Sequence, residues 1–249
     1  VPRAMLGMYL LAGDPTLFLN AGAGRAIDEV VLRDGSVLQP TWPAPLGQRG
    51  LTMMRLLSST MGLVNAAGGE SQAANCAYVI YFARGVGDDG TTFLMSDGVG
   101  VGYGARPYAD GINAVYYVAQ ENYPAEMMEQ TYPARLRAYG IHRDSGGPGR
   151  WRGGCGVVRE VELLAPEATF AIRIDGVEKP AWGVKGGKCG GAGRAVVNPG
   201  THQERELDPF SDGNVLKRDD VLRLETGGGG GWGHPYDREP ELVLADVVA

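Results

Sequence analysis

Apolar residues recur at helical spacing in one long segment, residues 49–67 (RGLTMMRLLSSTMGLVNAA). These positions lie three or four residues apart, which predicts an amphipathic helix. They are Leu51, Met54, Leu57, Met61 and Val64. Gly68 and Gly69 follow the segment, as glycine commonly does beyond a helix end. A shorter helix is predicted from Pro124 through PAEMMEQTY, because proline at the first position and acidic residues in the first turns favour a helix start.

Short runs that alternate in polarity or carry β-branched residues predict strands in both halves of the chain. In the first half they lie at residues 77–83, 91–95 and 113–119, with a strand pair around an Asp34-Gly35 turn within 26–40. After residue 134 the pattern is almost all β, in the runs LRAYGIH, GVVREVELLA, ATFAIRI, AVVNPG and VLRLETG. Glycine, proline and aspartate turns separate these runs.

The two halves together predict an α+β fold. A mixed α/β region is expected over residues 1–133, and a β-rich region with many glycine loops over 134–249. Residues 2–12 are apolar and predict the end of a helix that packs on another surface. Hydrophobic residues make up 44% of the 249 residues, so a sizeable core can be buried.

Charge and cysteine content narrow the classes of function. The net charge is −6 and no basic stripe occurs, which argues against a nucleic-acid partner. No apolar run reaches the roughly 18 residues of a membrane span, so no membrane association is expected. Three cysteines without a close pair favour a reducing, cytoplasmic location. No Cys/His cluster has metal-ligand spacing, so no metal ligand is predicted.

Glycine is the unusual component, at 40 of 249 residues, more than twice the average share of about 7%. The glycines cluster in Gly146–Gly156, Gly183–Gly193 and Gly227–Gly233. Clustered glycine indicates backbone at positive φ, or backbone that another group approaches closely.

The first cluster begins with Asp144-Ser145-Gly146-Gly147-Pro148, the pattern found around the nucleophile of chymotrypsin-like proteases. A triad of that kind needs a histidine base well upstream of the serine in the chain. The first histidine is His142, only three residues before Ser145, and cysteine pairs to brace the loops are absent. We therefore interpret Ser145 as a turn residue, in a loop where Asp and Ser cap backbone amides. A substrate-facing loop is the alternative.

Successive glycine amides can form an anion-binding concavity, and arginines beside them can pair with carboxylate or phosphate. No known phosphate-loop pattern is present. Close backbone packing at a tight β corner is the other interpretation of the same glycines. The candidate substrate-binding or loop-shaping residues are Asp144, Arg150, Arg152, Gly227, Gly228, Gly229, Gly230, Gly231 and His234.

A pair of acids lies on the predicted short helix. Glu126 and Glu129 are three residues apart and share a helix face, as an acid/base pair would. A solvated helix start, favoured by the helix dipole, is the more common explanation of such a pair.

Three stretches together resemble the hydantoinase B/oxoprolinase family. They are NYPAEMMEQTYPARLRAYGIHRDSGGPGRWRGGCGVVRE, PAWGVKGGKCGGAG and TGGGGGWGHPYDREPELVLADV. The earlier FLNAG, DGSVLQP and GYGARPYADG fit the same family in the same order. The resemblance covers nearly the whole chain and corresponds to the C-terminal half of a typical B-type subunit.

The resemblance implies an ATP-dependent enzyme complex. In this family an A-type partner with an actin-like ATPase fold phosphorylates a carbonyl oxygen or bicarbonate, and the B-type subunit acts on the activated substrate. ATP and Mg would lie on the partner subunit, and a divalent metal in the N-terminal half of the B-type subunit, with no cofactor bound by this chain. The expected partners are the A-type ATPase subunit, the N-terminal half of the B-type subunit and a small-molecule substrate.

Three functions follow from this resemblance. The first is a subunit that opens cyclic amides such as hydantoins, oxoproline or lactams. The second is a subunit of an ATP-dependent ketone carboxylase. The carboxylase alternative stays open because the segment ARPYADGINAVYYVAQENYP departs from the usual motif of hydantoinase subunits. The third is a non-catalytic subunit that only holds such a complex together.

Overall fold

The computed structural model describes residues 16, 29–45, 47–116 and 121–248. The chain divides into two compact units, Val1–Ser71 and Gln72–Ala249. The helix end expected at residues 2–12 lies outside the described residues. No described helix is both long enough and apolar enough to cross a bilayer.

The first unit contains α2 (Arg49–Ala66). The helix predicted over residues 49–67 is therefore confirmed. The backbone turns away directly afterwards, since Gly68 has a φ of +90° and its N–H donates to the Asn65 carbonyl. The strand pair predicted within 26–40 is wrong for the described part of that range. A tight turn and one isolated bridge, Ser36 to Gln39, stand there instead.

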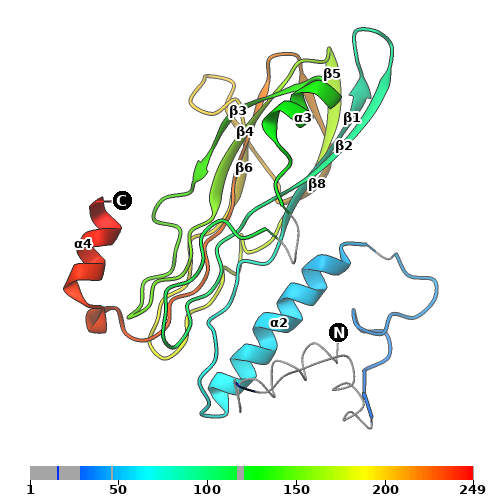
Figure 1. Cartoon of the computed structure of the whole chain (residues 1–249). Coiled ribbons are helices and arrows are strands. Elements are labelled where there is room, and N and C mark those ends of the chain that lie inside the picture. The colour runs from blue at the N-terminus through cyan, green and yellow to red at the C-terminus, as the bar shows by residue number, and fades with distance from the viewer. Residues whose placement is uncertain (1–15, 17–28, 46, 117–120, 249) are drawn as a thin grey trace. The chain divides into compact units, whose positions relative to one another are not determined.

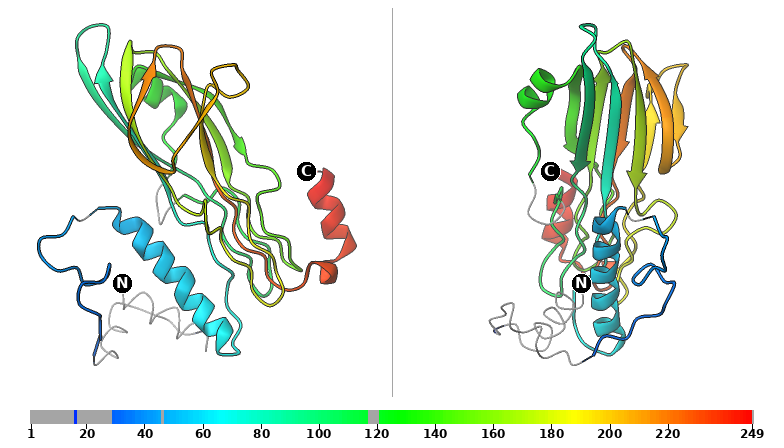
Figure 2. Two further views of the ribbon diagram at one scale, coloured as in Figure 1. Left: turned by 180° about the vertical axis from the view of Figure 1, so that it is seen from behind. Right: turned by 90° about the vertical axis from the view of Figure 1, so that its right-hand side faces the viewer.

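The second unit is built on two antiparallel sheets (Figures 1 and 2). The four-stranded sheet has the order β2-β1-β5-β8, and the five-stranded sheet has the order β3-β4-β9-β6-β7. The strands of the first are β1 (Val79–Val86), β2 (Thr92–Val99), β5 (Glu167–Ile174) and β8 (Phe210–Lys217). Those of the second are β3 (Ala134–Ile141), β4 (Val157–Leu163), β6 (Arg194–Val197), β7 (Arg205–Leu207) and β9 (Val221–Glu225).

The inward side chains of both sheets form one apolar core. In β5, strict alternation places Ala168, Phe170, Ile172 and Ile174 inside, as the sequence pattern predicts. The ring of Tyr81 on β1 stacks on Phe170, with 6.5 Å between centroids. Burial of such side chains stabilises the sandwich by about 1.5–3 kcal/mol for each large residue.

The predicted α+β fold is therefore present, and its second half is β-rich. The helix expected at Pro124 is α3 (Ala125–Thr131), with Pro124 in the N-cap position. A strand at 113–119 is wrong for the described part of that segment, where Val115 makes only an isolated bridge to Val101. The boundary expected at residue 134 stays a prediction, and the pairing of β1 with β5 joins residues on both sides of it.

Two strands and one α-helix of the described residues had no counterpart among the predicted elements. They are β7, β8 and the last helix, α4 (Pro240–Val248). The sequence of β8, FSDGNVLK, is too polar and too glycine-broken to read as a strand, but the edge of β5 supplies its hydrogen-bond partners. The start of α4 carried an ordinary signal, a proline followed by Glu241 in the first turn.

Candidate functional site

The glycine clusters lie side by side at one end of the two sheets, where they form a layer joined by backbone hydrogen bonds (Figure 1). The N–H of Gly147 donates to the carbonyl of Gly229 at 2.8 Å, and the N–H of Gly229 donates to Gly154 at 2.9 Å. The third cluster meets the second in the same way, from Gly231 to the Lys188 carbonyl at 2.9 Å. Segments about 40 to 80 residues apart are thus held backbone to backbone.

Only glycine fits at the centre of this layer. A Cβ added to Gly228 would overlap the carbonyl oxygen of Ser145, and one on Gly102 would overlap that of Gly154. A Cβ on Gly153 would meet the carbonyl of Gly229 in the same way. Since these obstacles are backbone atoms, no side-chain rotation relieves them. Close backbone approach explains the glycine content of the clusters.

Backbone N–H groups of the third glycine cluster are already hydrogen-bonded within the layer. The N–H groups of residues 228–231 donate to the carbonyls of Gly191, Gly154, Ala74 and Lys188, in that order. An anion-binding concavity needs several free N–H groups that point to one place. These four amides therefore build the layer, and a ligand would have to be held by the side chains around it.

Ser145 is a turn residue, as the sequence indicates. It is 2% exposed, its hydroxyl donates to the carbonyl of His142 at 2.7 Å, and it accepts from the N–H of Gly156 at 2.9 Å. The ring of His142 is engaged elsewhere, 2.8 Å from the Thr226 carbonyl. Asp144 has a φ of +59°, which turns the chain at this point. The serine has neither the exposure nor the base that a nucleophile needs.

Four charged side chains form an ion-pair cluster beside the glycine layer. Arg238 donates to both oxygens of Asp110, each at 2.8 Å, and lies 2.8 Å from Asp246. Arg152 reaches the other oxygen of Asp246 at 3.1 Å, and its backbone N–H donates to Asp110 at 2.7 Å. The two positive and two negative charges balance. The cluster ties the 102–111 segment to the first glycine loop and to α4.

Hydrogen bonds favour the charged forms of Asp110 and Arg238. Burial alone would raise the pKa of Asp110, but hydrogen bonds from Arg238 and from the Arg152 backbone, with the charges of both arginines, hold that pKa below its ordinary value. The hydrogen bond to Asp110 in turn raises the pKa of Arg238. Neither group therefore acts as a proton donor or acceptor near neutral pH.

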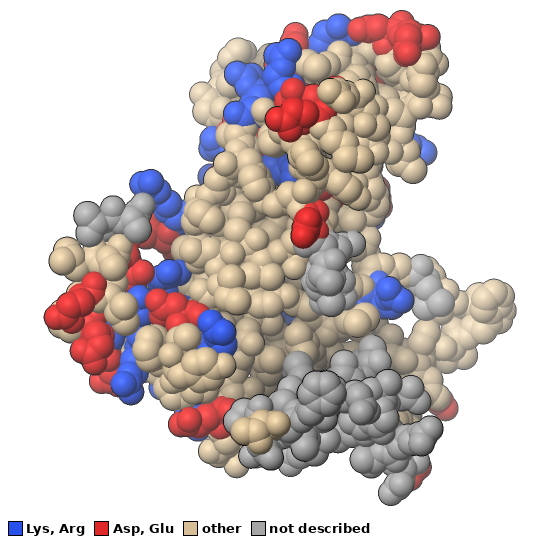
Figure 3. Space-filling model, viewed as in Figure 1, with Lys and Arg blue, Asp and Glu red and all other residues tan. Residues whose placement is uncertain are grey.

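A cavity of about 1130 Å³ opens between the first glycine loop and α4. Asp144 and Arg152 line it, as does Arg143, which makes no ion pair among the described residues. Arg150 and His234 are not among its lining residues. Acidic and basic side chains alternate around α4 on the face shown in Figure 3. The surface there carries no field of one sign.

Arg150 and His234 make contacts outside the lining of the cavity. Arg150 accepts at its carbonyl from Arg238 at 3.1 Å and holds its guanidinium 6.0 Å from the Trp151 ring centroid. His234 is exposed and caps the short 3-10 helix η2 (Pro235–Asp237) by accepting from the Tyr236 N–H at 3.3 Å. The structure brings these loops together around one cavity and separates their residues into lining and support.

Sequence reasoning missed Asp110, Asn113 and Arg238. Asn113 accepts from the Cys155 N–H at 2.8 Å and from Arg152 at 3.3 Å. Asp110 and Arg238 stood within the motifs GYGARPYADG and HPYDREP, so the signal was a polar residue inside a glycine-rich motif. Their partnership was invisible, because 128 residues separate them.

The acid pair on α3 has a structural role. Glu129 accepts from the backbone N–H of Leu136 at 2.9 Å and so joins α3 to the start of β3. Glu126 lies in the first turn of the helix.

Within the described residues, no three His, Cys, Asp or Glu side chains gather in a group that would hold a metal ion. The donor set of this region therefore does not fit a divalent metal, and no chemical step is assigned to one here.

The model of the hydantoinase B/oxoprolinase family matches residues 2–235. The chain is 30% identical over 239 residues to the B subunit of a putative D-/L-hydantoinase of Pseudomonas sp. strain NS671, covering 92% of this chain and 39% of that protein. It is 28% identical over 263 residues to the beta chain of the caprolactamase of Pseudomonas jessenii, covering 97% and 44%. The chain thus spans less than half the length of these relatives.

Two solved structures share the fold. The ATP-dependent caprolactamase of Pseudomonas jessenii superposes with a TM-score of 0.80 at 22% identity, over 98% of this chain and 45% of that chain. Nucleotide-free acetone carboxylase superposes with a TM-score of 0.61 at 20% identity, over 79% and 31%. At these identities the likeness shows a common fold.

Proposed function

This chain belongs to the hydantoinase B/oxoprolinase family, and from that premise we propose that it is one subunit of an ATP-dependent complex that opens cyclic amides. A partner ATPase subunit transfers the terminal phosphoryl group of ATP to the carbonyl oxygen of the amide. Water then attacks the activated carbonyl carbon, the ring C–N bond breaks with a proton taken up by the nitrogen, and an acyl phosphate remains. A second water hydrolyses this acyl phosphate to the carboxylate and inorganic phosphate. Relatives named as hydantoinase and caprolactamase subunits support this class of substrate.

The observation that carries the proposal is the cavity in front of the glycine layer. Gly146 and Gly149 of the first glycine loop lie in its lining, and at these two positions no side chain takes up space that a substrate could use. Arg143 stands at its wall without an ion pair among the described residues, and an arginine fork matches a phosphorylated oxygen. We assign Arg143 to hold the anionic group of the activated substrate. Arg152, fixed by Asp246, keeps the wall in place, with Asp144 at the rim.

The other predicted site residues act through this wall. Gly227–Gly231 and Arg150 hold the loops at the spacing that defines the cavity, and His234 caps the turn that leads to α4. None of them is proposed to touch the reacting atoms. The chain contributes binding and orientation, while the phosphoryl transfer belongs to the partner.

Exposed apolar side chains on α4 support assembly with other chains. Leu244 and Val247 are large, apolar and exposed on this helix. Exposed apolar patches of this kind mark protein–protein contact surfaces. We propose an A-type ATPase subunit and the remainder of a B-type subunit as the partners.

The first experiment is to purify the complex that contains this chain, identify every co-purifying chain, and measure ATP hydrolysis with hydantoin, caprolactam or 5-oxoproline. Amide-dependent ATP hydrolysis with release of the ring-opened product supports the proposal. ATP hydrolysis that depends on bicarbonate and a ketone instead would assign the complex to the carboxylases, whose fold it also shares. A chain that purifies alone and turns over no ATP-dependent substrate would contradict both.

The role of Arg143 is tested within the same complex. Arg143→Ala should lower kcat/KM for the amide by about tenfold or more, as expected for loss of one charged contact to the activated group. Arg84→Ala is the matched control, since Arg84 is an exposed arginine on β1 outside the cavity. An unchanged kcat/KM in Arg143→Ala with intact assembly would favour a purely structural subunit.

A further inference from the structure

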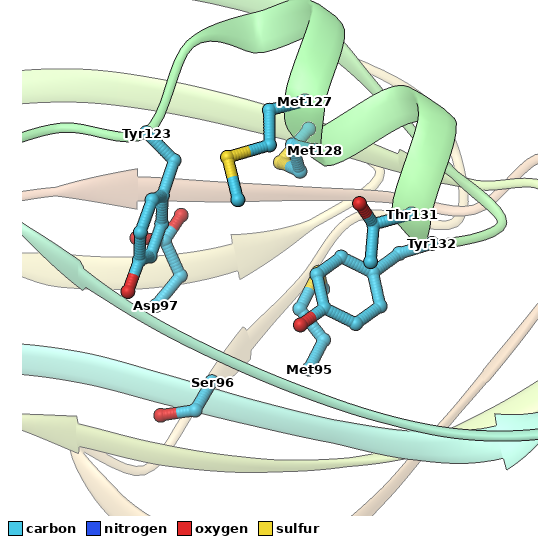
Figure 4. A pocket seen from close by; sticks show the side chains of 8 residues that line it. All are labelled: Met95, Ser96, Asp97, Tyr123, Met127, Met128, Thr131 and Tyr132. Atoms are coloured by element: carbon cyan, nitrogen blue, oxygen red, sulfur yellow. The ribbon is translucent and has the colours of Figure 1, made fainter.

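A second cavity is lined by residues of α3, its flanks and β2. Figure 1 shows α3 toward the end of the sheets away from the glycine layer. The volume of the cavity is about 130 Å³. Met127, Met128, Tyr123 and Tyr132 line it from α3 and its flanks, and Met95 lines it from β2 (Figure 4). A dry cavity of about 150 Å³ holds one benzene ring. This cavity therefore has room for a single small ring.

The polar group of this cavity is a carboxylate that is only half satisfied. The Asp97 side chain is 3% exposed. One oxygen, Oδ2, is bound by Arg159 at 2.6 Å and by the Tyr81 hydroxyl at 3.3 Å. The other, Oδ1, has no hydrogen-bond partner among the described residues. A buried acceptor without a donor is costly, about 1–3 kcal/mol, and such groups call for a partner.

The charge of the carboxylate is already balanced. Arg159 is buried, its guanidinium pairs with Asp97, and it lies 5.4 Å from the centroid of the Tyr139 ring. A cationic ligand would add an uncompensated charge to a buried site. A neutral ligand with one N–H or O–H donor matches what the site lacks. Burial raises the pKa of Asp97, and the charge of Arg159 with the hydrogen bonds from the Tyr81 hydroxyl and the Gly98 backbone opposes that shift.

The entrance is apolar and exposed. Tyr123 and Met127 are 54% and 53% exposed, and Figure 4 shows both side chains at the same edge of the cavity. Thioether sulfur makes favourable contacts with aromatic rings. Asp97 Oδ1 itself has almost no exposed surface, so a ligand can reach it only if a lining side chain moves.

We propose that the cavity lined by Met95, Asp97, Tyr123, Met127, Met128 and Tyr132 binds a small neutral molecule with a one-ring apolar body and a single N–H or O–H donor directed at Asp97. The ring packs between the methionines and tyrosines, and the donor satisfies Oδ1. This site stands apart from the glycine layer and does not depend on the proposed function.

Phenol is the test probe, and toluene, of nearly equal shape without a donor, is its control. The 249-residue chain is labelled at its methionine methyl groups and titrated in an NMR experiment. We expect saturable shifts at Met95, Met127 and Met128 with a phenol Kd of about 1 mM, and at least about tenfold weaker binding of toluene. Equal binding of the two probes would overturn the assignment of Asp97 as the recognition group.

Variants separate the cavity from adventitious surface binding. Thr131→Phe places a ring at the lining and should abolish phenol binding, whereas Gln130→Ala, on the same helix outside the lining, should leave it unchanged. Met127→Ala should raise the Kd for phenol by about threefold to tenfold, because contact with the ring is lost. Asp97→Asn is less suitable, because it leaves Arg159 unpaired in the core. Phenol shifts that persist in Thr131→Phe, or no saturable shift at about ten times the expected Kd, would overturn the site.

Discussion

The β-sandwich and the glycine layer are two ways of holding the same chain together. In the sandwich, large side chains such as Phe170 and Leu224 fill the space between two sheets. In the glycine layer, side chains are absent and the backbones of Gly147, Gly154 and Gly229 touch directly. The sandwich is stabilised mainly by apolar burial, and the layer by backbone hydrogen bonds at close approach.

This difference predicts opposite sensitivities. A packed core can relax around a lost side chain, and the cost depends on how far the space collapses. A layer of touching backbones cannot make room for an added atom, because the obstacle is the main chain itself. The sandwich should be most sensitive to removal of atoms and the glycine layer to their addition.

The largest effect should come from Gly228→Ala. Its Cβ would overlap the Ser145 carbonyl, so we expect a loss of more than about 3 kcal/mol in the free energy of unfolding, or failure to fold. Gly140→Ala, on β3 with nothing near its added Cβ, should change stability by less than about 0.5 kcal/mol. Urea denaturation measures both. Equal, small effects would show that the layer is looser than these backbone contacts indicate.

Removal of a core side chain should come next. Leu224 is buried in β9, and Leu224→Ala should cost about 3 kcal/mol, within the range for buried leucine. Leu94 on β2 is exposed, and Leu94→Ala should cost less than about 0.5 kcal/mol. The comparison uses the same unfolding measurement. If the two leucines behaved alike, the assignment of the sandwich core would be wrong.

Loss of a charge from the ion-pair cluster beside the layer should have an intermediate effect on the free energy of unfolding. Asp110→Asn removes the charge that receives two hydrogen bonds from Arg238, and should cost about 2 kcal/mol. Asp212 pairs with Arg173 in an exposed position, so Asp212→Asn should cost less than about 0.5 kcal/mol. Equal values for the two variants would mean that the cluster does not brace the loops.

The smallest effect concerns pH. Because the folded state holds the pKa of Asp110 below its ordinary value, this group stabilises the fold at pH values above the unfolded pKa of about 3.9. That contribution is lost as the pH falls through the lower, folded pKa. Asp110 is partly exposed, so the loss should be about 1 kcal/mol or less.

Asp97 has the opposite pH dependence, because its pKa is raised in the folded state. Its contribution to the free energy of unfolding is present below the unfolded pKa and is lost as the pH rises through the folded pKa. The prediction for Asp110 is tested by measuring the free energy of unfolding of wild type and Asp110→Asn between pH 7 and pH 3. A wild type that loses no more stability in acid than the variant would contradict the shift assigned to Asp110.

Part of the sandwich was readable from the sequence, because strands such as β5 place alternate side chains in the core. Residues 168–174 alternate perfectly, and the helix at 49–66 repeats its apolar residues at helical spacing. By contrast, β8 is polar and glycine-broken, and its strand character comes from pairing with β5. Local pattern predicts an element only where the element itself faces both a core and solvent.

The site divided in the same way. The turn role of Ser145 could be predicted, since chain order excluded a protease triad and Asp-Ser-Gly-Gly favours a turn. The partnership of Asp110 with Arg238 could not, because nothing in either local pattern encodes a contact across 128 residues. Arg150 and Arg152 also look alike in sequence, yet only Arg152 lines the cavity.

The sequence by itself determined the family, the strand-rich second half, and the need for close backbone approach at the glycine clusters. Tertiary structure decided which carbonyl each glycine faces, which arginines pair, and which carboxylate oxygen in the core is left without a donor. The physical reason is that propensity and periodicity act over a few residues along the chain. Hydrogen bonds and overlaps depend instead on distances between segments that only folding brings together.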